Sequence, residues 1–126
     1  KHYGVYNFVG ENIYEAAKDN FIFRFLDFVQ VKGKKIPVKV YELVAQKSNV
    51  NNSIVGLVRK FENGLDYYYQ QEWEKAINAF KSAEKMEEHF TARNTTPSAV
   101  YIKRCIMFKD NPPGKDWDGV WKMTSK

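Results

Sequence analysis

Two different periodicities divide the chain near residue 50. Before residue 45, apolar residues alternate along the chain or form short β-prone runs, whereas from Ile54 onward they recur at every third or fourth position. The first pattern is typical of strands and the second of amphipathic helices. The polar, Asn-rich stretch 46–53 has no periodicity and predicts a linker. The pattern therefore predicts an α+β chain in which a small strand unit is followed by an all-α unit.

The first half predicts a β-hairpin and one short helix. Residues 21–31 alternate with apolar side chains on both faces, interrupted only at Arg24 and Asp27, which we interpret as a structural pair rather than as catalytic residues. Such a strand needs cover on both sides. The expected elements are a β-prone run at 5–9, a helix at 12–19, strands at 21–31 and 37–44, and a turn at 32–36 in which Gly33 can take a positive φ angle.

The second half predicts three helices, at about 54–70, 73–89 and 97–109. Ser53 is the candidate N-cap of the first helix. Thr96 as N-cap, with Pro97 at the first helical position, is a good start signal for the third. The aromatic segment 117–121 is expected to fold back onto the helices.

Small and aromatic residues recur at fixed offsets in the first two of these helices. This spacing, over residues 57–90, resembles a tetratricopeptide repeat, in which small residues let paired helices approach and an aromatic residue fills the gap. A single repeat cannot bury its own face, so the third helix is expected to cap it. The repeat positions are Gly64, Tyr67, Ala76, Phe80 and Ala83, and the capping face is expected to hold Ala99, Ile102, Cys105, Ile106 and Phe108.

Composition narrows the class of protein. A chain of 126 residues with 44% hydrophobic residues can bury a core. No apolar run approaches the roughly 20 residues of a membrane helix, and the single cysteine, Cys105, cannot form an internal disulfide. A cytoplasmic setting is therefore expected. The start Lys1-His2-Tyr3-Gly4 lacks an initiator methionine, which favours a piece of a longer protein.

The positive charge is concentrated in the first half. Residues 1–60 contain ten Lys/Arg and five Asp/Glu; of the totals of 20 and 15, this leaves ten of each for residues 61–126. The excess favours an anionic ligand near the hairpin. The alternative is that lysines on an exposed hairpin only discourage aggregation between sheets.

The hairpin itself carries a recognisable motif. Its sequence resembles the closing hairpin of the catalytic domain of a class III nucleotide cyclase, written roughly Val-Lys-Gly-Lys, a spacer, then Pro-Val-x-Val-Tyr-Glu-Leu. The matching residues are Val31, Lys32, Gly33, Lys34, Pro37, Val38, Val40, Tyr41, Glu42 and Leu43. The resemblance implies that Lys32, and secondarily Lys34, contacts the triphosphate of the substrate, ATP or GTP.

Two further stretches resemble the same family. A Lys-x-Tyr-Gly stretch begins the chain, and the tail with Arg104-Cys105, Pro112-Pro113 and Trp117-Asp118-Gly119-Val120 resembles the extension that follows the catalytic domain of some bacterial cyclases. The implied division is a partial catalytic domain at 1–45, a linker at 46–53 and a helical module at 54–126. The metal-binding aspartates, expected to hold Mg or Mn, the purine-selecting residues and the transition-state pair lie upstream in that family, so this chain alone is expected to be inactive. An upstream membrane anchor in the parent protein is compatible with this interpretation.

The helical half and the strand unit are also compatible with roles in binding other chains. The helical module is a candidate for binding a protein partner, with the hairpin as its scaffold, and the incomplete strand unit favours a homodimer or strand exchange. A metal site is not expected, because His2 and His89 have no partner at ligand spacing. Cys105 is interpreted as a small buried hydrophobe. Nucleic-acid binding by the aromatic cluster at Tyr67–Tyr69 and Trp73 is not expected, because Glu62, Asp66, Glu72 and Glu74 surround it.

Overall fold

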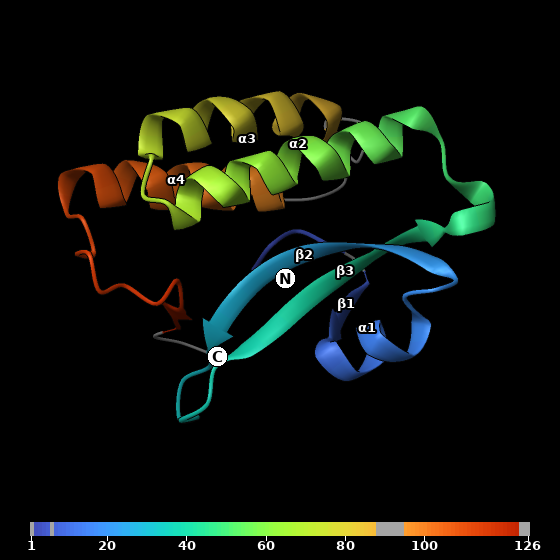
Figure 1. Cartoon of the computed structure of the whole chain (residues 1–126), viewed down its shortest axis with the longest axis horizontal. Helices are drawn as coiled ribbons and strands as arrows, with labels where there is room; N and C mark the ends of the chain where they lie inside the picture. The colour runs from blue at the N-terminus through green and yellow to red at the C-terminus, as the bar shows by residue number, and fades with distance from the viewer. Residues whose placement is uncertain (1, 6, 88–94, 124–126) are drawn as a thin grey trace. The chain divides into compact units, whose positions relative to one another are not determined.

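The computed structural model describes residues 2–5, 7–87 and 95–123, and within them it has the expected α+β class. Figure 1 shows the path of the chain. In chain order its elements are β1 (Phe8–Gly10), α1 (Glu11–Ala17), β2 (Phe21–Gln30), β3 (Val38–Gln46), the 3₁₀ turn η1 (Lys47–Asn49), α2 (Asn52–Tyr69), α3 (Trp73–Glu87), α4 (Pro97–Asp110) and β4 (Trp121–Lys122).

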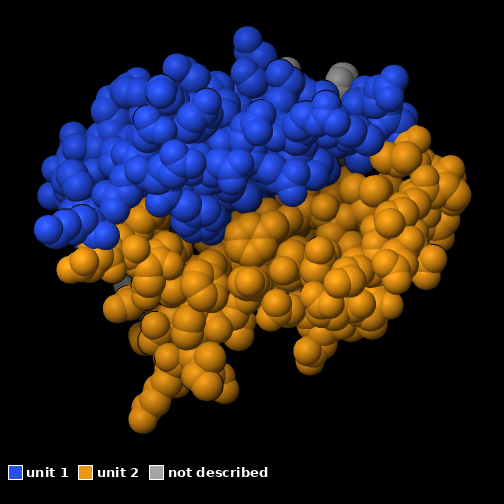
Figure 2. All heavy atoms as spheres, viewed as in Figure 1, with its two compact units in different colours: residues 1–5, 51–115 blue, residues 6–50, 116–126 orange. Residues whose placement is uncertain are grey.

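The chain forms two compact units, coloured separately in Figure 2. The helical unit comprises Lys1–Val5 and Asn51–Lys115, and the sheet unit comprises Tyr6–Val50 and Asp116–Lys126. Each unit is therefore built from two separate stretches of chain. The tail after Lys115 belongs with the sheet and not, as expected from its aromatic residues, with the helices.

The sheet has the strand order β1-β3-β2-β4. β2 and β3 form the predicted antiparallel hairpin, with Val29 opposite Val38 next to the turn and Phe21 opposite Gln46 at the far end. β1 pairs antiparallel with β3, and β4 pairs parallel with β2. Because β1 spans three residues and β4 two, each covers only part of its long neighbour.

A β-bulge at Leu26 changes which residues of β2 share a face. Phe25 lies opposite Tyr41 and Asp27 opposite Val40, so Leu26 is the extra residue. Strict alternation predicts Arg24 and Asp27 on opposite faces, and the bulge puts both on one face with Val29. All three side chains are buried. The assignment of faces from sequence was therefore wrong beyond Phe25.

The other face of the hairpin is covered by α1. The Tyr14 ring stacks on Tyr41, with 4.1 Å between ring centroids and an interplanar angle of 1°, and it meets Phe23 edge-on at 5.2 Å. Phe25 adds a second edge-on contact to Tyr41 at 5.5 Å. These rings form the aromatic layer between the short helix and the strands.

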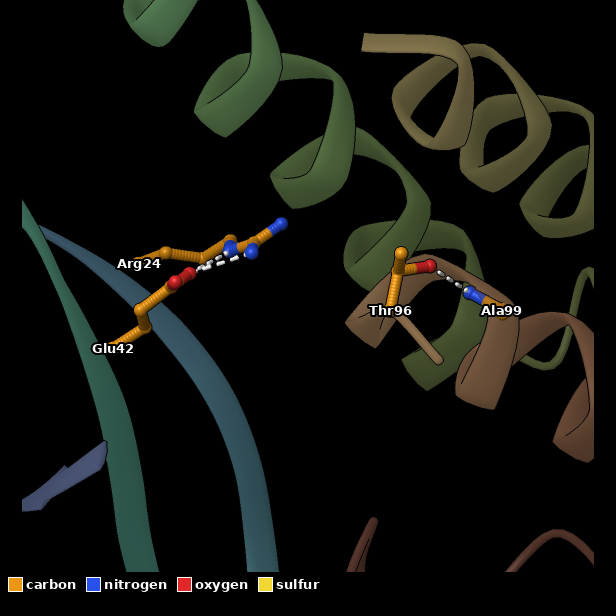
Figure 3. A network of polar contacts seen from close by, with 4 residues as sticks. All are labelled: Arg24, Glu42, Thr96 and Ala99. Atoms are coloured by element: carbon orange, nitrogen blue, oxygen red, sulfur yellow. Dashed lines mark hydrogen bonds and ion pairs between the residues drawn. The ribbon is translucent and has the colours of Figure 1, made fainter. Parts of the chain in front are cut away.

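Two helices of the second unit, α2 and α4, begin at side-chain caps. Asn51, not Ser53, caps α2: its Oδ1 accepts a hydrogen bond of 2.9 Å from the backbone N–H of Ile54. Asparagine two positions earlier lets the helix begin before Ser53. Thr96 caps α4 as predicted, its Oγ1 accepting from the N–H of Ala99 at 3.0 Å (Figure 3), with Pro97 in the first turn.

Aromatic rings form the core of the helical unit. Tyr101 of α4 stacks on Phe80 of α3 at 5.1 Å and meets Phe61 of α2 edge-on at 5.6 Å, so α4 does cap the α2–α3 pair. Gly64 is buried beside Phe80, as the repeat spacing predicts. The core tyrosine of α2 is Tyr68, which is fully buried, whereas Tyr67 is only half-buried.

The buried face of α4 differs from the expected one. Helical spacing brings Tyr101, Arg104, Cys105 and Phe108 inward, whereas Ile106 is 52% exposed. Ile106 lies one position after Cys105 and therefore about 100° around the helix, outside the i, i+3, i+4 stripe that packs. α4 consequently carries apolar residues on its exposed side as well as in the core.

Candidate functional site

The turn between β2 and β3 carries the residues that the sequence singles out. Gly33 has a φ angle of +86°, the left-handed conformation expected for it, and the N–H of Lys34 donates to the carbonyl oxygen of Val31 at 2.9 Å. Lys32 and Lys34 therefore flank a tight, hydrogen-bonded turn, which projects as a loop at the end of the hairpin in Figure 1.

Four lysines of this hairpin point into solvent. Lys32, Lys34, Lys35 and Lys39 are exposed, and in the part of the chain that the structure describes none of them forms an ion pair with a carboxylate. No acidic residue lies between positions 28 and 41. The ammonium groups are thus available to an anion, and flexible lysines suit phosphate groups, for which charge matters more than fixed geometry.

A buried ion pair lies further along the same two strands (Figure 3). The guanidinium of Arg24 donates to Oε1 of Glu42 through Nε at 3.0 Å and Nη2 at 2.5 Å. Both residues are at most 6% exposed, and they are direct cross-strand neighbours. Sequence reasoning singled out Arg24 but overlooked Glu42 as its partner. The register of the hairpin could have indicated this pair, because Arg24 and Glu42 lie directly opposite each other on β2 and β3.

Asp27 completes the buried charges on this face. Its Oδ1 accepts a hydrogen bond of 2.9 Å from the backbone N–H of Phe28, and the residue is fully buried. The bulge at Leu26 is what turns Asp27 to the same side as Arg24. These buried charges belong to β2 and β3, and we interpret them as a structural feature of the hairpin stem.

Cys105 has the chemistry of a core residue. It is completely buried on α4, and burial raises the pKa of its thiol to about 12, with the nearby Arg104 acting weakly in the opposite direction. A thiol with such a pKa stays protonated near neutral pH and is a poor nucleophile. The interpretation of Cys105 as a small hydrophobe is consistent with this geometry.

The described residues contain no group of three or more His, Cys, Asp or Glu side chains placed to hold a metal ion. His2 is exposed, and His89 lies outside the described residues. Among the described helices, none is both long and apolar enough to cross a membrane.

The aromatic cluster near the α2–α3 turn is mainly part of the core. Tyr68 is fully buried and Trp73 is 8% exposed, its ring stacking on Phe108 at 5.0 Å. A shallow hollow of about 360 Å³ beside Trp73 is lined by charged residues that pair with one another, Lys75 with Glu72 and Lys109 with Glu74. On α2, desolvation and the carboxylate of Asp66 raise the pKa of Glu62.

Comparison with known proteins gives one distant relative with an assigned activity. The chain is 29% identical over 89 residues to "Adenylate cyclase, terminal-differentiation specific" from Dictyostelium discoideum. The match covers 70% of this chain but only 4% of the length of that protein. No family model matches the chain, and no solved structure matches it. The comparison supports a relationship to an adenylate cyclase and gives no support to a bacterial origin.

Proposed function

We propose that this chain is the C-terminal portion of a class III nucleotide cyclase, comprising the last strands of the catalytic domain and a helical extension. The observation that carries the proposal is the exposed Lys-Gly-Lys turn on a hairpin whose sequence resembles the family's closing hairpin. The parent enzyme would convert ATP or GTP to a 3′,5′-cyclic nucleotide in the cytoplasm as part of signal transduction. In it, Lys32 and Lys34 would contact the triphosphate.

The similarity to the Dictyostelium adenylate cyclase supports this proposal beyond the hairpin. An aligned stretch of 89 residues within a chain of 126 must include roughly residues 39–88, wherever it begins. It therefore contains the returning strand β3 and most of α2 and α3. This extent favours the helical unit as an integral part of the enzyme rather than an unrelated neighbour.

The chemistry assigned to this chain is limited to binding charge. The parent cyclase would use Mg or Mn, but the described residues lack a set of oxygen or nitrogen ligands for such an ion. They therefore do not fit that role, and we assign no step through a metal to them. The lysines would neutralise phosphate charge, and this chain alone is expected to have no cyclase activity.

Substitution of the turn lysines tests the proposal. In the parent enzyme, Lys32→Ala is expected to lower kcat/KM for the nucleotide about tenfold to a hundredfold, the range that corresponds to losing a charged hydrogen bond. Lys34→Ala is expected to have a smaller effect. Lys35→Ala is the matched control, since it removes the same charge from the same turn and is expected to leave turnover nearly unchanged. Normal kinetics in both Lys32→Ala and Lys34→Ala would remove the assigned role.

A protein-interaction module of the tetratricopeptide type is the second candidate. The observation in its favour is the exposed apolar side of α4, where Ile106 is 52% and Met107 43% exposed. Under this alternative, Ile106→Glu would abolish binding of a protein partner while leaving nucleotide turnover untouched. Lys32→Ala and Lys34→Ala would then change neither partner binding nor nucleotide turnover.

We also propose that the isolated chain self-associates through its sheet. β4 pairs only with Val29 and Gln30 of β2, and β1 only with Val40–Glu42 of β3, so both long strands have stretches of edge without a neighbour among the described residues. Long open edges favour pairing with another chain. Light scattering is expected to give a homodimer at high concentration, formed by edge pairing or strand exchange. A monomer at all concentrations would rule this assembly out.

A further inference from the structure

The last described residues of the chain return to the sheet as a short strap, residues 116–123. Asp118 shapes its start: Oδ1 accepts a hydrogen bond of 3.0 Å from the N–H of Val120, around Gly119 with a φ angle of +81°. Val120 is 8% exposed, so the side chain of at least this strap residue is packed against the protein. This geometry directs Trp121 and Lys122 into β4.

The strap meets β2 at the two residues that precede the lysine turn. β4 runs parallel to β2, with Trp121 opposite Val29 and Lys122 opposite Gln30. Beyond β4, the backbone N–H of Met123 donates to the carbonyl oxygen of Gln30 at 2.9 Å. The strap thus holds the end of β2 on the side away from β3.

Gln30 connects the strap to the turn. While its backbone accepts from Met123, its side-chain amide Nε2 donates to the carbonyl oxygen of Lys34 at 3.1 Å. Lys34 in turn donates its N–H to Val31. A continuous series of hydrogen bonds therefore runs from the strap through Gln30 to Lys34, one of the two lysines of the candidate site.

We propose that the strap is a positioning element for the lysine turn, and that Gln30 couples the two through its hydrogen bonds to Met123 and Lys34. The loop of a hairpin opens more easily than its strands, and a third strand on Gln30 restricts that opening. A turn that is already ordered loses less conformational entropy when its lysines bind an anion. The functional part of this inference rests on the proposed contact with a nucleoside triphosphate, whereas the coupling between strap and turn does not.

Met123 offers a matched pair of variants for the coupling. Met123→Pro removes the N–H that donates to Gln30, and Met123→Ala keeps it while shortening the side chain. In the full chain, hydrogen exchange of the Lys34 amide is expected to be about five- to tenfold faster in Met123→Pro than in the wild type, the factor for losing roughly one hydrogen bond. Met123→Ala is expected to exchange at the wild-type rate. Amides in the middle of α3 report whether the helical unit is intact.

Gln30→Met keeps the inference testable if Met123→Pro disturbs the whole sheet. It preserves the length of the side chain and removes the amide that donates to Lys34, and it is expected to accelerate exchange at Lys34 without changing the middle of β3. Wild-type exchange at Lys34 in both Met123→Pro and Gln30→Met would overturn the strap as a positioning element.

Kinetics in the parent enzyme separate this inference from the proposed function. If the strap positions the lysines for a triphosphate, Met123→Pro raises KM for the nucleotide several-fold in the wild-type background. In the Lys32→Ala background, the same Met123→Pro change is expected to leave KM unaltered. If Lys32→Ala and Lys34→Ala are silent while Lys34 still exchanges faster in Met123→Pro, the cyclase assignment fails and the coupling stands. If KM rises in Lys32→Ala but exchange is unaltered by the strap variants, the coupling fails alone.

Discussion

Gly64→Ala is expected to destabilise the helical unit by about 2 kcal/mol, although alanine is the better helix former. A Cβ at position 64 would lie 2.6 Å from Cε1, 2.7 Å from Cδ1 and 2.8 Å from Cζ of Phe80. Overpacking of this kind costs about 1–3 kcal/mol, and it opposes a gain of up to about 1 kcal/mol in helix propensity. The steric term dominates because the Phe80 ring is fully buried and fixed between Tyr101 and Phe61.

Gly56→Ala is the control, because it makes the same change on the same helix. Its Cβ would meet the terminal methyl of Met86 at 3.1 Å, and that methyl sits on a flexible side chain that can turn aside. Gly56→Ala is therefore expected to be neutral or to stabilise by up to about 1 kcal/mol. Urea unfolding monitored by helical circular dichroism measures both variants. Equal stability of the two would show that Phe80 yields and that the close approach at Gly64 is not required.

Glu42→Ala is expected to have the larger effect, a loss of about 3–5 kcal/mol from the sheet unit. It would leave the buried guanidinium of Arg24 without the carboxylate that accepts two of its hydrogen bonds. Arginine cannot shed its charge to escape burial. Since small domains have a stability of about 5–15 kcal/mol, this unit would lose a large part of its stability.

The exposed ion pair between Lys109 and Glu74 supplies the comparison for Glu42. Its side chains are 44% and 68% exposed, so Glu74→Ala is expected to cost less than about 1 kcal/mol. Urea unfolding measures both variants by tryptophan fluorescence, to which Trp117 and Trp121 of the sheet unit and Trp73 of the helical unit contribute. A cost below 1 kcal/mol for Glu42→Ala would mean that other acceptors hold Arg24 in place.

Local patterns in the sequence predicted much of the fold. The hairpin, the positive φ angle of Gly33, the Thr96 cap and the three helices all follow from residues within a few positions of one another. Such features depend on backbone preferences and on short-range hydrogen bonds, which the sequence contains directly. The exposed lysine turn of the candidate site belongs to this group.

Features set by distant partners could not be predicted. The bulge at Leu26 depends on how β2 registers against β3, and it reverses the face of Asp27. β4 is two residues long and forms only because β2 offers an edge, so no periodicity marks it. Tyr67 and Tyr68 are adjacent and chemically identical, and only the packing of α2 against the other helices puts Tyr68 in the core. The partnership of Arg24 with Glu42 likewise required the register.

The return of the strap to the sheet has a consequence for synthesis of the protein. On the ribosome, the chain emerges from its N-terminus, so the hairpin and then all three helices of the second unit leave the exit tunnel before β4 exists. Domains generally fold as units during translation. The helical unit can therefore fold while the nascent hairpin still has an open edge at Gln30. Closure of that edge therefore waits until the residues that follow α4 have been translated.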